Sequence, residues 1–98
     1  MTVTIQIGNS DDGLCQKRWA EFVDFLMIAT LMNSKEIHFS GGPPTRSEYQ
    51  NFCVVCDVGD DDTKLDLMKA MRQLAGKFSQ QSIAWTEGRT SFLVPYVC

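Results

Sequence analysis

Apolar residues follow two different spacings along the chain, and these spacings predict its strands and helices. Val3, Ile5 and Ile7 alternate with polar residues, which is typical of a strand with one buried face. Residues 15–32 and 63–78 carry apolar side chains at helical spacing instead, so each predicts an amphipathic helix. The chain therefore begins with a strand and contains two helices of similar length.

Further strand-like segments complete the predicted order of elements. Ile37 and Phe39 alternate with polar neighbours, which predicts a short strand with both side chains on its buried face. Residues 52–58 are apolar on both faces, as expected of a central strand. Residues 82–86 alternate again, and residues 91–96 predict an additional strand at the C-terminal end.

The resulting order, βαββαβ with the extra C-terminal strand, predicts an α+β fold. Strand–helix–strand crossovers are almost always right-handed. Two of them joined by a hairpin give a ferredoxin-like two-layer sandwich, in which one antiparallel sheet carries both helices on one face. A length of 98 residues predicts one domain, residues 1–98.

Composition narrows the classes of function. The formal charge of −3 argues against direct binding of nucleic acid and favours a protein partner with a basic surface. The chain has no apolar run near the ~20 residues that span a bilayer, so no membrane contact is expected. Its amino terminus has no basic segment followed by an apolar block, which predicts a cytoplasmic protein.

Acidic residues gather in two turns, Gly8–Asp12 and Gly59–Asp62, each between a strand and a helix. The loops after the first and third strands are expected at the same end of the sheet. Six carboxylates would then meet there, namely Asp11, Asp12, Asp57, Asp60, Asp61 and Asp62. One or two acids per helix start are enough to stabilise the helix dipole, so capping does not explain the whole cluster.

This acidic patch leaves three interpretations open. It is a solvated surface that caps the helices, a patch that binds a basic protein, or a divalent-metal site of a small phosphoryl-transfer enzyme. The sequence has no EF-hand loop and no coherent catalytic residue set. We therefore expect a protein that is not an enzyme and that has no metal, no cofactor and no catalytic residue.

The first predicted helix is more apolar than one buried stripe requires. Phe25, Ile28 and Met32 fall about 100° from that stripe, so they either widen the core or form an exposed face for a partner or a homodimer. The long loop after the second strand adds Arg46 and Tyr49, residue types enriched at interaction hot spots. These five residues join the six acids as expected partner-binding residues.

Three segments together resemble small uncharacterised proteins of bacteria, prophages and bacteriophages. They are Ile5–Asp12, Trp19–Val23 with the nearby Gln16, and Ser82–Gly88. The resemblance covers most of the chain in order, although Cys15 stands where such proteins are expected to have a threonine helix cap. It implies a phage-encoded protein acting in the host cytoplasm, and it assigns no catalytic residue.

A small acidic phage protein without enzyme motifs is similar, in size and charge, to anti-CRISPR inhibitors. By this analogy we expect an inhibitor of a host defence complex that occupies or mimics a nucleic-acid site. Contact is expected through the acidic patch, the 41–50 loop, or both. The alternatives are the metal-dependent enzyme and a homodimeric structural module.

Overall fold

The structure, a computed structural model, describes residues 1–9, 13–44 and 49–96. Within these residues the elements follow the predicted βαββαβ order. They are β1 (Thr2–Gly8), α1 (Gln16–Met32), β2 (Glu36–Gly41), β3 (Asn51–Asp57), α2 (Asp61–Lys77) and β4 (Ala84–Gly88).

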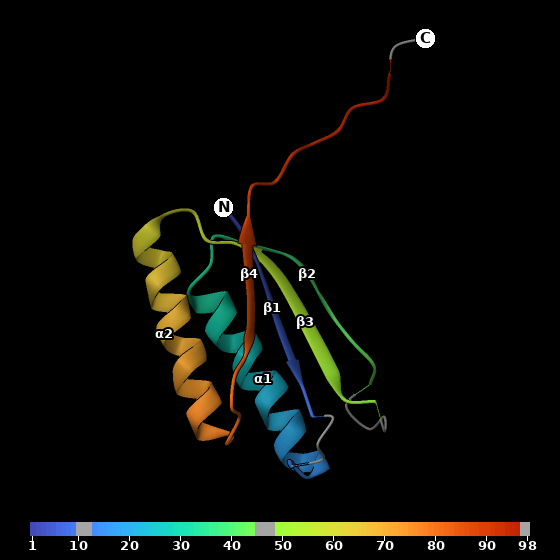
Figure 1. The fold of residues 1–98 in the computed structure, drawn as a ribbon, viewed down its shortest axis with the longest axis vertical. Coiled ribbons are helices and arrows are strands. Elements are labelled where there is room, and N and C mark those ends of the chain that lie inside the picture. Colours follow the sequence, from blue (N-terminus) through green and yellow to red (C-terminus); the bar gives the residue numbers. More distant parts are fainter. Residues whose placement is uncertain (10–12, 45–48, 97–98) are drawn as a thin grey trace.

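The four strands form one antiparallel sheet in the order β2-β3-β1-β4. Both helices lie against the same face of this sheet, and the other face is open (Figure 1). The predicted ferredoxin-like sandwich is therefore confirmed. Among the described residues, no helix has the length and apolar character needed to cross a membrane.

The core lies between the helix-bearing face of the sheet and the two helices. Val3, Ile5 and Ile7 face it from β1, as their alternation predicts. Phe22 of α1 stacks on Phe78, just after α2, with ring centroids 4.8 Å apart and planes 20° from parallel. Offset stacking of this kind adds roughly 0.5–1.5 kcal/mol to the area that the rings bury. The aromatic contact therefore joins the first half of α1 to the end of α2.

The predicted strand at residues 91–96 is wrong. This segment pairs with no strand, and Figure 1 shows it leaving the body of the molecule toward the C-terminus. The reason lies in the register of β4 on β1, where Gly88 already pairs with Thr2 at the start of β1. Beyond Gly88 the sheet has no neighbouring strand, so the backbone groups of residues 91–96 find no ladder to join.

The expectation that Phe39 and Ile37 share the buried face of the sheet is also wrong. The register between β2 and β3 shifts between these two residues, so that Ile37 pairs with Cys56 but Phe39 pairs with Val55. A bulge inserts one unpaired residue and moves the next side chain to the other face. Here His38 is the extra residue, and Phe39 turns to the open face, where it is 57% exposed.

Candidate protein-binding surfaces

The chain leaves the sheet for its two acidic turns at opposite ends of the sheet. β1 and β3 are antiparallel, and their register pairs Gly8 with Asn51 and Thr2 with Asp57. The chain therefore leaves β1 at the end where β3 begins. The expectation of a shared end overlooked the antiparallel direction of these two central strands. Asp11 and Asp12 themselves lie outside the described residues.

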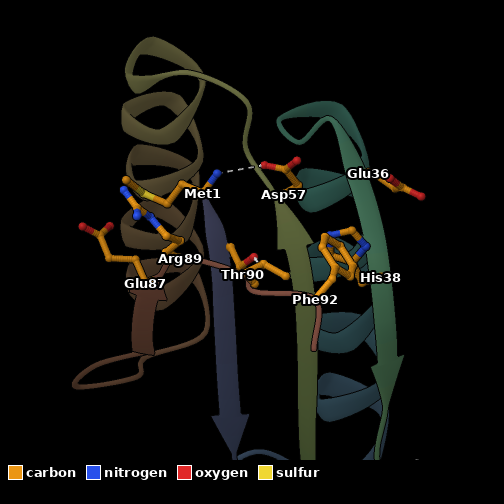
Figure 2. A pocket seen from close by; sticks show the side chains of 10 residues that line it. Met1, Glu36, His38, Asp57, Glu87, Arg89, Thr90 and Phe92 are labelled. Atoms are coloured by element: carbon orange, nitrogen blue, oxygen red, sulfur yellow. Dashed lines mark hydrogen bonds and ion pairs between the residues drawn. The ribbon is translucent and has the colours of Figure 1, made fainter. Parts of the chain in front are cut away.

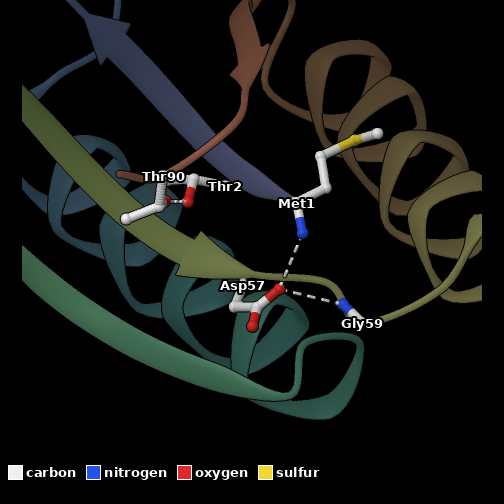
Figure 3. A network of polar contacts seen from close by, with 5 residues as sticks. All are labelled: Met1, Thr2, Asp57, Gly59 and Thr90. Carbon is white, nitrogen blue, oxygen red and sulfur yellow. Dashed lines mark hydrogen bonds and ion pairs between the residues drawn. The ribbon is translucent and has the colours of Figure 1, made fainter. Parts of the chain in front are cut away.

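The four remaining acids follow one another through the β3–α2 turn, and two of them hold that turn in shape. Figure 3 shows the first of the two, Asp57. Asp57 accepts hydrogen bonds from the terminal ammonium of Met1 at 3.2 Å and from the Gly59 N–H at 3.1 Å. Gly59 has φ +75°, which glycine adopts without steric cost. The Gly59 N–H, followed by the ammonium, lowers the pKa of Asp57 below its ordinary value.

The start of α2 uses the other three acids. Asp60 is the N-cap, and its carboxylate accepts a hydrogen bond of 2.7 Å from the Thr63 N–H. That bond lowers the pKa of Asp60. Asp61 and Asp62 occupy the first turn, where carboxylates interact favourably with the helix dipole. Local structure therefore accounts for these acids without requiring a ligand.

The described acids also lack the grouping that a metal site needs. Within residues 1–9, 13–44 and 49–96, no three His, Cys, Asp or Glu side chains lie close enough to hold one metal ion. Asp57 is already engaged by an ammonium group, and Asp60 by a backbone N–H. The metal-dependent enzyme therefore gains no support from this part of the chain, and it stays an untested alternative.

The apolar face of α1 is exposed, as one of the two sequence interpretations proposed. The exposed fraction rises along the helix, from 39% at Phe25 to 52% at Ile28 and 79% at Met32, and Leu31 adds a further exposed side chain. These four residues are called the α1 apolar face below. The buried residues Trp19, Phe22, Val23, Leu26 and Thr30 occupy the other side of the helix.

Phe25 belongs partly to the fold. Its ring lies 6.0 Å from that of Phe78, and the Lys77 ammonium lies 3.9 Å above its centroid. A cation over an exposed ring contributes roughly 0.5–1 kcal/mol. Ile28 and Met32 are more exposed than Phe25, so they are the more available part of the α1 apolar face.

Of the two residues of the long loop that were expected to bind a partner, the structure describes one. Tyr49 is 74% exposed, whereas Arg46 lies outside the described residues. At the start of the loop, a Cβ on Gly42 would collide with the Asn51 carbonyl oxygen. The two sides of the β2–β3 connection therefore approach each other so closely that only glycine fits at this position.

The open face of the sheet is the surface that the sequence did not reveal. The bulge places Phe39 there beside Val55, and the same row continues through Thr4 of β1 to Thr86 of β4. Strict alternation along β2 would instead place Phe39 on the buried face with Ile37. The sequence carries one signal for this change in the direction of Phe39. β2 is an edge strand, and an edge strand has little room to bury two large apolar side chains on the same face.

A cleft of about 650 Å³ lies at the end of this open face where Met1 and Asp57 meet (Figure 2). Residues after β4 form one wall of the cleft, and the hydroxyls of Thr90 and Thr2 contact each other across its floor (Figure 3). Its charged and aromatic lining consists of Glu36, His38, Asp57, Glu87, Arg89 and Phe92.

Two carboxylates in the lining of this cleft have hydrogen-bond or ionic partners. The carboxylate of Glu87 accepts hydrogen bonds from the Trp85 indole at 3.0 Å and from the Lys64 ammonium at 3.5 Å. The Trp85 bond, followed by the Lys64 charge, lowers the pKa of Glu87. Asp57 is bound by the ammonium of Met1. These pairings hold Glu87 and Asp57 in the lining of the cleft.

Comparisons of the chain with protein-family models, with curated proteins and with solved structures find no match.

Proposed function

We propose that this protein is a protein-binding module and that the α1 apolar face is its principal contact surface. The observation that carries the proposal is the exposure of 52%, 63% and 79% at Ile28, Leu31 and Met32. Single exposed apolar residues are common on protein surfaces, but a contiguous group on one helix marks an interaction site. Methionine suits such a site because its flexible thioether adapts to the shape of a partner.

The position of the α1 apolar face supports a partner with basic residues around an apolar centre. Its most exposed member, Met32, ends α1, and the chain then turns so that the Lys35 N–H donates to the Asp57 carbonyl oxygen at 2.7 Å. The end of α1 and the acidic β3–α2 turn therefore lie at the same end of the molecule. Apolar anchors with a charged rim are the usual composition of a protein interface.

The more specific role that we propose is inhibition of a host defence complex by a phage-encoded protein. It rests on the resemblance of the sequence and on the net charge of −3. A basic groove that normally holds nucleic acid would meet the carboxylates of Asp61 and Asp62 at the rim, while Ile28 and Met32 anchor the contact. The long-range part of this attraction weakens as salt shortens the Debye length from ~10 Å at 0.1 M.

The test is affinity capture of partners from a bacterial lysate with the wild-type protein and three double or single variants. Ile28→Asp with Met32→Asp removes the apolar anchors, and Asp61→Lys with Asp62→Lys reverses the rim. Thr86→Asp on the open face is the matched control, since it also adds a carboxylate at an exposed position. Exposed substitutions of this kind usually change stability by less than about 0.5 kcal/mol, and thermal unfolding verifies this.

We expect the anchor variant to lose the captured protein and the rim variant to retain less of it, with a larger loss at high salt. The Thr86→Asp control should retain it fully. Capture that is equal for the wild type and the anchor variant would contradict the proposal. If the rim variant and the wild type captured the protein equally at all salt concentrations, the acidic rim would have no part in binding, and the apolar anchors would remain.

A further inference from the structure

The segment after β4 is the least covered part of the described chain, although it is apolar. Phe92, Leu93 and Val94 are 89%, 94% and 83% exposed, and Tyr96 is 98% exposed. Residues 91–96 are called the C-terminal arm below. Phenylalanine, valine and tyrosine are residues that favour β-strands, where they pack against a sheet surface. An apolar segment with strand-forming residues and no sheet neighbour is suited to pairing with another molecule.

The arm leaves the molecule from the open face of the sheet. Thr90 contacts Thr2 of β1, and Phe92 and His38 of β2 line the same cleft (Figure 2). Side chains alternate along an extended chain, so Phe92, Val94 and Tyr96 would share one side of an extended arm. Six residues span about 20 Å at ~3.3 Å per residue, which lets the arm reach well beyond the cleft.

The same molecule offers a surface that matches this apolar side. Phe39 is 57% exposed on the open face and pairs with the half-buried Val55. This part of the face lies on β2 and β3. The arm crosses the sheet toward β2, since Phe92 lines the same cleft as His38. The row nearer the cleft is polar and charged, because it consists of Glu36, Asp57 and Thr2. The apolar part of the open face is therefore a confined target.

We infer that two copies of this chain exchange their C-terminal arms, each arm packing on the Phe39–Val55 part of the other copy's open face. The exchange is reciprocal, so one two-fold axis satisfies both arms and closes the assembly. The occupant of the open face is thus a second copy, and this contact is separate from the α1 apolar face that carries the proposed function.

The area that the arms can bury explains why both are needed. The two aromatic side chains of the arm, Phe92 and Tyr96, can bury roughly 150–250 Å² each. With a similar area covered on the receiving face, one arm accounts for roughly 600–1,000 Å² in total, which is below the roughly 1,200 Å² of a specific interface. Two arms together reach roughly 1,200–2,000 Å², which is the range of stable interfaces.

The experiment measures the oligomeric state of the full chain by sedimentation equilibrium in a reducing buffer, so that no disulfide contributes. Phe92→Ser and a chain ending at Thr90 test the arm, and Phe39→Asp tests the receiving face. Cys98→Ser is the control for loss of the terminal thiol, and Ile28→Asp is the control for a dimer formed through α1. Circular dichroism and thermal unfolding establish that each variant is folded.

We expect a dimer whose dissociation constant rises roughly 100- to 10,000-fold in Phe92→Ser, because each dimer loses two buried rings. The truncated chain should be monomeric, and Phe39→Asp should also weaken the dimer. The two controls should remain dimeric. A wild-type monomer at the highest concentration tested overturns the inference, as does a dimer that survives truncation. A dimer sensitive to Phe92→Ser but not to Phe39→Asp overturns the open face as the receiving surface.

Discussion

Asn9 holds the start of the first strand–helix connection, and its replacement gives a sharp test of the structure. Asn9 is only 4% exposed at the end of β1. Its side-chain amide donates to the Leu14 carbonyl oxygen at 2.8 Å and to Gln50 Oε1 at 2.5 Å, and its side-chain oxygen accepts from the Leu14 N–H at 2.9 Å. One buried side chain therefore links β1 to the chain just before α1 and to the chain just before β3.

The Asn9→Ala variant loses all three hydrogen bonds at once. Each contributes roughly 0.5–1.5 kcal/mol net, and a buried backbone group left without a partner costs roughly 1–3 kcal/mol. Leu14 is itself buried, so its N–H and C=O are the groups at risk. We expect a loss of about 2–4 kcal/mol in the free energy of unfolding. For a domain of this size the melting temperature falls by roughly 4–8 °C per kcal/mol.

The assay is urea unfolding followed by tryptophan fluorescence and circular dichroism, with the slope m fitted for each variant. Asn51→Ala is the matched control, because Asn51 is an exposed asparagine at the same end of the sheet, opposite Gly8. It should change stability by less than about 0.5 kcal/mol. Asn9→Asp keeps an acceptor for Leu14 but loses both donors, so it should remain destabilised. If Asn9→Ala were no less stable than Asn51→Ala, the bridging role assigned to Asn9 would be refuted.

Three further predictions test other features of the fold. Deleting His38 removes only the bulge residue and preserves the strand pairs on either side of it, so urea unfolding should show a loss of less than about 1 kcal/mol in the free energy of unfolding. Deleting Val55 shifts the central strand by one residue and should prevent folding. The pKa of Asp60 is lowered on folding, so its contribution is complete above the ordinary value of 3.8 and is lost as the pH falls through the lower folded value. Asp60→Asn keeps the cap without the charge and should flatten this acid-side loss in urea midpoints measured against pH. Burial raises the pKa of the Cys56 thiol, so maleimide should modify the exposed Cys15 first and reach Cys56 roughly 1,000-fold more slowly by peptide mapping. Equal labelling rates would contradict the buried position.

The order of elements could be predicted from the sequence because it depends on local periodicity. Alternation in β1 and helical spacing in α1 and α2 identify which side chains face the core, and the structure confirms Ile5, Phe22 and Leu67 there. Helix geometry alone also places Ile28 and Met32 away from the buried stripe, but only the structure shows that they are exposed and do not widen the core.

The candidate surfaces were predicted less well, because they depend on how distant segments are placed together. The turns Gly8–Asp12 and Gly59–Asp62 look alike in sequence, but the direction of β3 relative to β1 separates their positions. Asp57 reads as a member of an acidic patch, whereas its partner is the terminal ammonium of Met1, 56 residues away. Neither the direction of β3 relative to β1 nor the pairing of Asp57 with Met1 can be seen in a local sequence pattern.

The sequence by itself determined the six elements, the helix-facing positions and the apolar excess of α1, since each of these follows from side-chain spacing within one element. Tertiary structure alone decided that β4 has no neighbour beyond Gly88, that a bulge turns Phe39 to the open face, and that the acids cap and brace a turn. These features depend on strand register and on backbone hydrogen bonds between distant segments. Such bonds are available only once the chain has folded, and a one-residue shift reverses the face of every side chain that follows it.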